Sequence, residues 1–598
     1  MTASARTLIL TLALGLSAIS ATAQEVTLTI ETDEPINGLR PVLRTASLAM
    51  GLRDDPDAVA QDYVAAARAD YRRLLTGLYA EGFYGGQVSI RIDGREASGI
   101  PPLDAPARIN TVEITVVPGP RFGFGRAEVA PLPPGATLPE GFATGQIARS
   151  GRISAAVRAG IDAWRDDGHA KAEPIGQQIT ARHANSEIDA RITLAPGPRL
   201  TFGRLMVTGN SDVRPNRIRA IAGLPEGAVF SPAELDAAAN RLRRTGAFAS
   251  VTMVEGDAQP DLTLPVTAQV DEQTPRRIGA GAELSTVEGL TLSAFWLHRN
   301  FLGGAERFRV EGEVTGIGGA TGGIDYALGL NFNRPASFGP LTDIYANLRV
   351  ERVDDPGFFI DQATVELGFS RQVNDSFRWE VGVGLLAAEV EDDLGARSYS
   401  FLTFPATLEW DRRDSPLDAT SGQYLQAELT PFVSLEDGGT GARLYADGRV
   451  YRSIGADDQL TFAARGQLGA VLGVDAADAP ADFLFFSGGG GSVRGQPFQS
   501  LGVDLGGGDQ IGGRGFLGAQ LEARYAVTDR IGAVAFYDVG LIGPDAFSDT
   551  GAEWHAGAGL GVRYDTGIGP IRLDVGVPVT GDRAGERVEL YLGIGQSF

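Results

Sequence analysis

The feature that most constrains the fold is a regular alternation of apolar and polar residues from about residue 276 to the last residue, Phe598. Two segments near the end show it clearly: Ile571, Leu573, Val575, Val577 and Val579 alternate with Arg572, Asp574 and Gly576, and Val588, Leu590, Leu592 and Ile594 alternate with Glu589, Tyr591 and Gly593. A strand of this kind has one apolar and one polar face, which is the pattern of a transmembrane β-barrel. In a soluble sandwich the apolar faces would pack on each other, and the pattern alone leaves that alternative open.

The number of alternating segments predicts the size of the barrel. We count eleven before a glycine-rich stretch at residues 488–491 and five after it, which makes about sixteen. The 323 residues from 276 to 598 then provide roughly 20 residues for each strand and its connection, enough for the ~9–11 residues of a tilted membrane strand. We therefore expect an all-β transmembrane barrel of about 16 antiparallel strands at residues 275–598. Its last strand is expected to run to Phe598, an aromatic residue at the membrane edge.

Composition excludes several classes of function. The chain of 598 residues carries 75 acidic against 52 basic side chains, so its net charge of −23 argues against nucleic acid as a partner. The absence of cysteine excludes a disulfide framework and thiolate zinc sites. The four histidines, His169, His183, His298 and His555, lack the spacing of metal ligands. We therefore predict no metal site, no cofactor and no enzymatic activity.

The N-terminus has the pattern of a secretory signal peptide at residues 1–23. Arg6 supplies the positive charge, residues 8–19 are apolar, and Ala21-Thr22-Ala23 fits a cleavage site. An anchoring helix is the alternative, but the apolar run is shorter than the ~20 residues needed to span a bilayer. We see no second apolar run of that length, so no transmembrane helix is expected.

A repeat organises the region between the signal peptide and the barrel. The sequence Pro-Gly-Pro-Arg at 118–121 recurs at 196–199 and, more weakly, as Thr-Pro-Arg at 274–276. We infer three α+β modules, at residues 24–118, 119–197 and 198–274, each built from a strand, two helices and two strands. Gly82, Gly168 and Gly246 follow helical segments and are expected to close them in the left-handed conformation. Function on these modules would lie at the sheet edges, which can accept an extended peptide as an added strand.

The glycine-rich stretch leads to a single arginine, in Gly488-Gly489-Gly490-Gly491-Ser492-Val493-Arg494-Gly495. Such a loop has no core of its own, while a guanidinium can bind a carboxylate through two parallel hydrogen bonds. We expect this loop to fold back into the barrel and dock on acidic residues of the wall. A solvated loop charge is the alternative.

Four motifs, which follow the family's order along the chain, resemble one superfamily of outer-membrane assembly and transport proteins, in which periplasmic POTRA domains precede a sixteen-stranded barrel. Val493-Arg494-Gly495 resembles the family's V-R-G-[FY] loop tip, with Gln496 at the fourth position, and Phe536-Tyr537-Asp538-Val539-Gly540 resembles an aromatic-x-D-x-G strand motif. The segment with Asp411, Arg413, Asp414, Pro416 and Gly422 resembles D-x-R-D-x-P-x-x-x-x-x-G, and residues 567–574 resemble the penultimate-strand motif. The resemblance covers nearly the whole mature chain.

The resemblance implies a lock in which Arg494 binds Glu522 and Asp538. Alternation supports it independently, because Leu521 and Tyr525 should face lipid and send Glu522 into the lumen. By the same parity, the outward side chains at 537 and 539 send Asp538 inward. Within the superfamily, three modules and this barrel length are most similar to the TamA branch.

A seam joins the two ends of the barrel, between a first strand near residues 278–286 and a last strand at 588–598. It is the one junction with no covalent turn across it. We expect Gly279, Gly281, Gly593 and Gly595 to weaken packing there. Leu284, Leu592 and Phe598 complete the residues of this predicted lateral gate, which would open sideways to pair with an incoming β-strand and release it into lipid.

These expectations define an outer-membrane assembly factor of a Gram-negative bacterium with its POTRA domains in the periplasm. Its substrates would be unfolded outer-membrane proteins such as autotransporters, released into the outer-membrane lipid. The resemblance implies a TamB-like, inner-membrane-anchored partner docking on the first module. A passive channel of two-partner-secretion type, with the substrate threading through the lumen, is the competing hypothesis. A plain porin does not explain the three N-terminal repeats.

Overall fold

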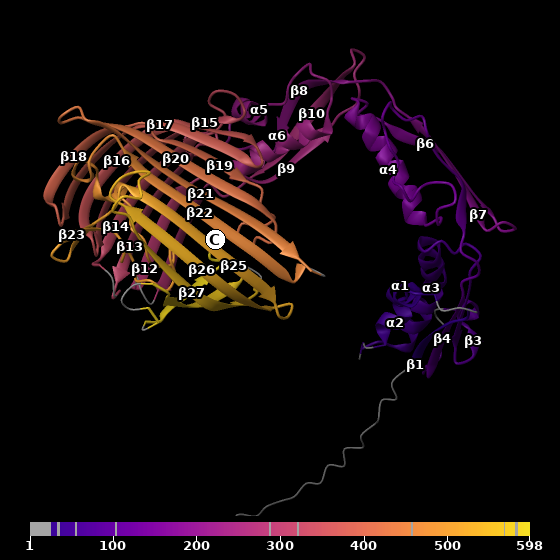
Figure 1. Ribbon diagram of the computed structural model, residues 1–598. Coiled ribbons are helices and arrows are strands. Elements are labelled where there is room, and N and C mark those ends of the chain that lie inside the picture. Colours follow the sequence, from indigo (N-terminus) through magenta and orange to yellow (C-terminus); the bar gives the residue numbers. More distant parts are fainter. Residues whose placement is uncertain are drawn as a thin grey trace, which may run out of the picture. The chain divides into compact units, whose positions relative to one another are not determined.

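The computed structural model describes residues 25–32, 36–53, 55, 57–101, 105–285, 289–319, 322–455, 458–566, 569–580, 584–585 and 587–598. The expected signal peptide lies outside these residues. The chain divides into two compact units, and most residues up to Phe202 belong to the first. The third module lies largely in the second unit together with the barrel. Figure 1 gives the labels used below.

The first module is a four-stranded sheet covered by helices. Its elements are β1 (Glu25–Ile30), α1 (Leu39–Ala46), α2 (Leu48–Leu52), α3 (Ala60–Ala80), β2 (Gln87–Ile92), β3 (Arg95–Glu96), a 3₁₀ turn (Ala97–Gly99) and β4 (Thr111–Val117), with sheet order β1-β4-β2-β3. Val64, Ala67, Leu74 and Leu78 bury one face of α3 at helical spacing. Gly82 follows with φ of 88°, so its predicted left-handed closure is confirmed.

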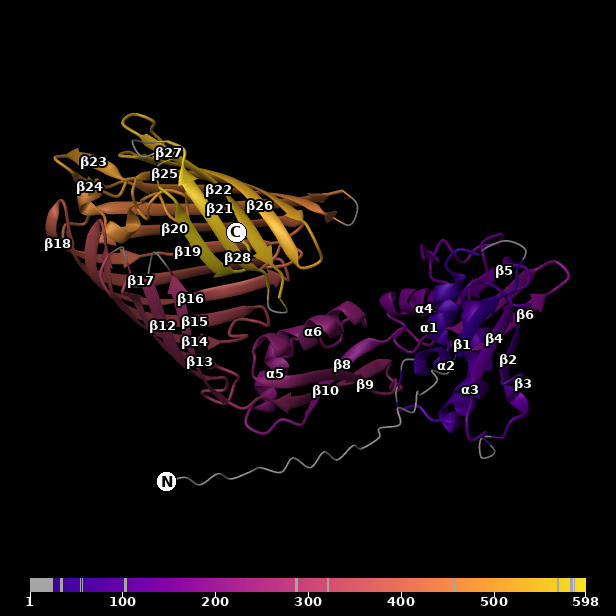
Figure 2. The same ribbon diagram turned by 90° about the horizontal axis from the view of Figure 1, so that it is seen from below.

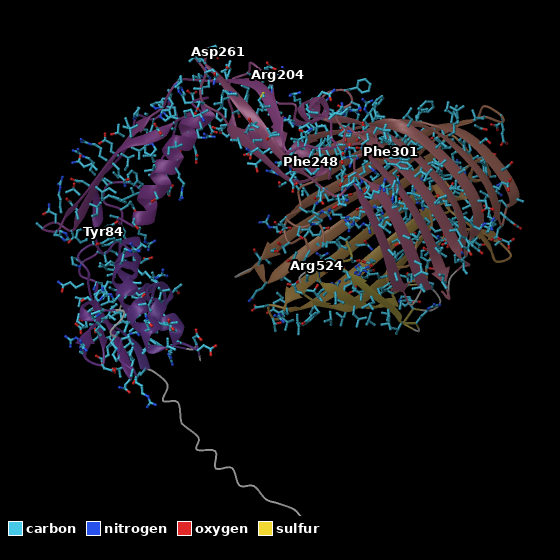
Figure 3. All side chains as sticks on the ribbon, turned by 180° about the vertical axis from the view of Figure 1, so that it is seen from behind. Tyr84, Arg204, Phe248, Asp261, Phe301 and Arg524 are labelled. Atoms are coloured by element: carbon cyan, nitrogen blue, oxygen red, sulfur yellow. The ribbon has the colours of Figure 1, made fainter. Side chains whose placement is uncertain are left out.

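The second module has one helix, not the two predicted. It consists of β5 (Gly123–Ala130), α4 (Ser150–Asp166), β6 (Glu173–Arg182) and β7 (Glu187–Ala195), in the order β5-β7-β6. Four prolines between residues 131 and 139 explain the missing helix, because proline has no N–H to donate and clashes with the preceding turn. Tyr84, labelled in Figure 3, stacks on Tyr79 of the first module and contacts Phe122 next to β5.

The third module has both predicted helices, α5 (Pro215–Ala222) and α6 (Pro232–Arg244), beside β8 (Thr201–Thr208), β9 (Phe248–Glu255) and β10 (Thr263–Glu272). The sheet order is β8-β10-β9, and Figure 2 shows both helices on one side of this sheet. Leu235, Ala238, Ala239 and Leu242 are the buried residues of α6, as their spacing predicts. None of the helices in the described ranges is long and apolar enough to cross a bilayer.

A large antiparallel sheet forms the barrel wall, with neighbours in sequence order (Figures 1 and 2). Its strands are β11 (Arg276–Ser285), β12 (Gly289–His298), β13 (Arg307–Ile317), β14 (Asp325–Arg334), β15 (Thr342–Asp355), β16 (Phe358–Asn374), β17 (Phe377–Asp392), β18 (Gly395–Thr403), β19 (Ala406–Asp411), β20 (Gly422–Ser434), β21 (Thr440–Ile454), β22 (Leu460–Leu472), β25 (Gly515–Ala526), β26 (Ile531–Gly543), β27 (Glu553–Tyr564), β28 (Ile571–Pro578) and β29 (Glu589–Ile594). β18 and β19 both lie between β17 and β20 and form one strand interrupted at Phe404-Pro405. This makes sixteen strands, so the predicted fold class is confirmed.

The loop between β22 and β25 carries its own short elements. These are two 3₁₀ turns (Ala476–Asp478 and Ala481–Phe483) and a hairpin of β23 (Val503–Gly506) and β24 (Asp509–Ile511). Phe483, Leu484 and Phe485 of this loop pack against inward side chains of the wall, including Phe401 and Phe432. The inner face of this end of the barrel is therefore apolar, where strict alternation predicts a polar one.

The carboxylate of Glu272 holds the segment of the third module that precedes its contact with the β12–β13 turn of the barrel. Glu272, at the end of β10, accepts hydrogen bonds from the amides of Ser211, Asp212 and Val213 at 2.8–3.1 Å. The following residue, Arg214, donates its amide to the carbonyl of Gly303 in the β12–β13 turn at 3.0 Å. Burial alone would raise the pKa of Glu272, but the three amide hydrogen bonds outweigh it and hold the pKa below its usual value.

We expect Glu272→Gln to loosen residues 211–213. Hydrogen bonds to a charged group are worth about 1.5–3 kcal/mol, so hydrogen exchange at these amides should accelerate about ten- to a hundredfold at pH 7. A depressed pKa contributes stability above the ordinary glutamate range that is lost as pH falls through the folded pKa. The difference between parent and variant should therefore shrink below about pH 4. Equal exchange at pH 7 would contradict this role.

Candidate functional site

The arginine loop folds into the barrel interior, as its glycines permit. Gly488, Gly489 and Gly495 have φ of 118°, 87° and 91°, a region that other residues rarely adopt. Ser487 and Leu501 exchange two backbone hydrogen bonds of 2.9 Å and close the base of the loop. The side chain of Ser487 also meets the ring of His555 on β27, with 2.8 Å between Oγ and Nε2.

The side chain of Arg494 is 1% exposed and reaches three carboxylates. Its Nε and Nη2 donate to the two oxygens of Asp538 at 2.7 and 3.0 Å, while its backbone amide donates to Asp538 Oδ2 at 3.1 Å. Nη1 donates to Glu522 at 2.5 Å and to Asp574 at 3.3 Å. The guanidinium also lies 3.8 Å from the ring centre of Phe536. The structure thus brings together the residues expected for the lock and adds Asp574.

Two further arginines balance the charge of this cluster. Arg524 donates to Glu522 at 2.7 Å, and Arg563 pairs with both oxygens of Asp574. Arg494 of the loop, Arg524, Arg563 and the three carboxylates are all buried and form one network of ion pairs with strands β25 to β28. Figure 3 labels Arg524 on this part of the wall. Removal of one partner from a buried ion pair leaves an uncompensated charge and costs about 3–5 kcal/mol.

The loop tip rests directly on wall backbone. A β-carbon at Gly557 would overlap the carbonyl oxygen of Arg494, and one at Gly576 would come within 2.7 Å of the amide nitrogen of Gly495. That amide donates to the hydroxyl of Tyr591 on β29 at 3.0 Å. Gln496, which stands where the family motif has an aromatic residue, donates its side chain to the carbonyl of Ala556 at 2.9 Å. Small wall residues thus form the floor of the loop site.

The motif at 411–422 forms the turn between β19 and β20. Asp411 pairs with Arg413 at 2.8 Å. Asp414 accepts the amides of Ser415, Thr420 and Ser421, and Arg413 reaches the carbonyl of Pro416 at 3.4 Å. Gly422 has φ of 102°, and a β-carbon there would overlap the carbonyl of Arg412. The motif therefore braces its own turn.

The last four residues do not continue the last strand. β29 ends at Ile594, Gly595 turns the chain with φ of 88°, and Phe598 is 7% exposed in a cluster with Ala419, Tyr451 and Ala463. The expectation that a strand runs to Phe598 at the membrane edge is therefore wrong. The amide of Gln596 donates to Leu417 O at 2.9 Å and its side chain donates to Asp418 at 2.9 Å. These contacts hold residues 595–598, here called the tail, against the 411–422 turn.

The seam between β11 and β29 differs from every other junction of the barrel. β11 pairs with β12 along all ten residues, and β29 pairs with β28 along all six. Within the described ranges, no strand pairing joins β29 to β11. The described residues therefore close the barrel wall at every junction between neighbouring strands except this one.

The predicted gate residues are distributed around this seam. Leu592 is exposed on the outer face, while the side chain of Leu284 lies outside the described residues, although its backbone belongs to β11. We expected the glycines to weaken packing; the ring of Phe295 covers Gly279 and the side chain of Arg572 covers Gly593, so neither glycine leaves an empty space. Gly281 faces Ser293, and Gly595 belongs to the tail.

Sequence reasoning missed five members of the network and its surroundings: Phe536, Asp574, Tyr591, Arg524 and Arg563. The alternation of the strands could have pointed to some of them, because residues two apart lie on the same face. Arg524 follows Glu522 by two residues, and Asp574 stands at an inward position of its strand. In the part of the chain that the structure describes, no three His, Asp or Glu side chains are placed to hold a metal ion.

Comparison with known proteins agrees with this architecture. Residues 300–598 match the model of the Omp85 superfamily domain, and residues 200–273 match a POTRA model described as a surface antigen variable number repeat. The chain therefore belongs to the Omp85 superfamily. It is similar to BamA from Haemophilus ducreyi lacking POTRA domains 1–3, with 16% identity and a TM-score of 0.60 over 75% of this chain and 94% of that one. It also matches CdiB from Escherichia coli, with 15% identity and a TM-score of 0.47 over 79% and 90%.

Membership of this superfamily places the chain among outer-membrane β-barrels with periplasmic POTRA domains. Such proteins are transporters or assembly factors, and no enzyme family is indicated.

Proposed function

We propose that the protein is an outer-membrane assembly factor of the TamA type. It would insert β-barrel proteins such as autotransporters through a lateral opening between β11 and β29. The observation that carries the proposal is the seam, where the described residues of β11 and β29 form no strand pairing while all other neighbouring wall strands do. An extended strand can add to the edge of a sheet through main-chain hydrogen bonds, and a junction without strand pairing is where an incoming strand would find such an edge.

Strand length supports the seam as the point of opening. β28 and β29 have eight and six residues, against thirteen in β26 and seventeen in β16. A tilted strand needs ~9–11 residues to cross the hydrocarbon. The wall is therefore short on the β28–β29 side of the seam, and β29 is held to the wall by a pairing of only six residues with β28.

The competing route leads through the lumen, as in a passive channel of two-partner-secretion type. The loop between β22 and β25 obstructs that route, because its apolar residues belong to a cluster of seventeen buried side chains with the wall. A threading polypeptide would have to break this cluster and displace Arg494 from its carboxylates. The lateral route requires neither.

The α+β modules would meet substrate and partner. We assign all three modules as POTRA domains in the periplasm of a Gram-negative bacterium, with a TamB-like, inner-membrane-anchored partner at the first. β6 of the second module is a candidate site for strand addition, since it lies at a sheet edge and nine of its ten residues are exposed.

Site-specific crosslinking during insertion of an autotransporter barrel tests the proposal. A photoreactive residue replaces Ala280 on β11 or Leu592 on β29, and the control position is Leu560, an outward residue of β27, which is paired on both sides. We expect the two seam positions to crosslink to substrate strands and Leu560 to give only background. Equal yields at all three, or crosslinks confined to a lumen position such as Arg309, would favour the channel.

A further inference from the structure

Two segments enter the barrel from opposite ends and meet the same ion network. The arginine loop follows β22 at one end, and the tail follows β29 at the other. Each is held by side chains of β25 and β27, strands that contribute to both docking sites.

Arg524 of β25 contacts both segments. On one side its Nε donates to Glu522, the carboxylate that also accepts from Arg494. On the other side its Nη2 donates to the main-chain oxygen of Phe598 at 3.1 Å, and its guanidinium lies 5.5 Å from the centre of the Phe598 ring. Nη1 donates to the carbonyl of Ala419 in the 411–422 turn at 3.3 Å. One guanidinium therefore connects the lock, the tail and the turn.

Arg563 of β27 provides a second connection. It pairs with Asp574, which also accepts from Arg494, and its Nε donates to the side-chain oxygen of Gln596 at 2.7 Å. Gln596 in turn binds Asp418 and Leu417 of the turn. Both arginines thus divide their donors between lock carboxylates and the tail.

We propose that Arg524 and Arg563 are positioning residues that couple docking of the arginine loop to docking of the tail. With Arg494 bound, each of the three carboxylates accepts from a guanidinium, and Arg524 and Arg563 still donate to Phe598 and Gln596. When Arg494 leaves, Asp538 loses its arginine, and Glu522 and Asp574 each lose one donor. Both guanidinium groups then turn toward the carboxylates, because an uncompensated buried charge is costly, and the tail loses its donors.

The coupling adds regulation to the proposed function, on which its biological meaning rests. The tail is continuous with β29 and holds the end of that strand against the 411–422 turn. Release of the loop at one end of the barrel therefore loosens the seam strand at the other. Coupling of two sites is reciprocal, so release of the tail loosens the loop by the same factor.

The experiment uses a thiol reporter in each segment, since the chain has no cysteine. Ser597→Cys reports on the tail, because the Ser597 hydroxyl is buried and makes no hydrogen bond. Val493→Cys reports on the loop, where Val493 is fully buried. The rate of labelling by a water-soluble maleimide is measured on the full chain in membrane vesicles without substrate.

We expect Arg494→Ala to accelerate labelling of the tail reporter about tenfold, within the usual range of 5- to 150-fold for coupled sites. Phe598→Ala should accelerate labelling of the loop reporter by a similar factor. Arg449→Ala serves as the matched control, because Arg449 pairs with Asp447, which keeps Arg465 as a second partner. Arg563→Gln should loosen both reporters, and Arg563→Lys should restore part of the protection.

Unchanged labelling of the tail reporter in Arg494→Ala, with the loop itself released, would overturn the coupling. If Arg494→Ala fails to fold, Gly557→Ala displaces the loop tip without removing a charge and gives the same comparison. The labelling experiment needs no substrate. An unchanged labelling rate therefore argues against the coupling alone, whereas the insertion function is tested separately at the seam.

Discussion

Replacement of Arg494 by alanine should release the loop from the barrel and lower the stability of the barrel by about 3–5 kcal/mol. Asp538 would lose three hydrogen bonds, and Glu522 and Asp574 one each. Only the bond from the amide of residue 494 can re-form with an alanine in place. The measurement is the temperature at which the barrel unfolds in detergent, together with the rate at which a broad-specificity protease cuts residues 488–500.

Two controls separate the lock from a general loss of lumen charge. Arg449→Ala removes a lumen arginine whose carboxylate retains another partner, so we expect a small effect. Arg494→Lys keeps the charge but loses the two-pronged contact with Asp538, so its effect should be intermediate. If Arg494→Ala leaves protease cleavage and unfolding temperature at parental values, Arg494 is not the anchor of the loop.

Gly557→Ala provides an independent test of the same contact. Its new methyl group would occupy the position of the Arg494 carbonyl and force the loop tip off the wall while every charge remains. We expect faster cleavage of the loop, as in Arg494→Ala. Gly466→Ala is the matched substitution, because nothing lies within 4 Å of a β-carbon added at Gly466. Equal behaviour of the two glycine variants would argue against close docking of the tip.

The barrel could be predicted because the side chains of a strand alternate between its two faces. This alternation is visible in a short stretch of sequence. Alternation in residues 521–525 and 537–539 is sufficient to direct Glu522 and Asp538 inward, and the structure places both at the guanidinium of Arg494. The helices of the third module follow for the same reason, since an amphipathic spacing is visible within thirteen residues.

Features that depend on distant partners could not be predicted in this way. The tail leaves the alternating pattern at Gly595, and its docking partners Leu417 and Asp418 lie nearly 180 residues earlier. The apolar inner face near Phe401 and Phe432 is unfavourable in a water-filled lumen and is explained only by the loop that covers it. In the sequence, Arg524 and Arg563 do not differ from other inward charged residues. Only their contacts with the tail distinguish them.

The second large effect concerns the seam itself, and it tests the central claim most directly. Cysteines replace outward residues of the two edge strands, Ala280 or Ala282 on β11 with Leu590 or Leu592 on β29, and the pair that oxidises is retained. Cysteines at Ala558 and Val577, which face each other on the paired strands β27 and β28, provide the control bridge.

Insertion of an autotransporter barrel is then measured with and without reductant. If the barrel edges must separate for insertion, the oxidised seam should abolish insertion, reduction should restore it, and the control bridge should have little effect. Continued insertion or secretion through an oxidised seam would contradict the lateral opening and favour passage through the lumen.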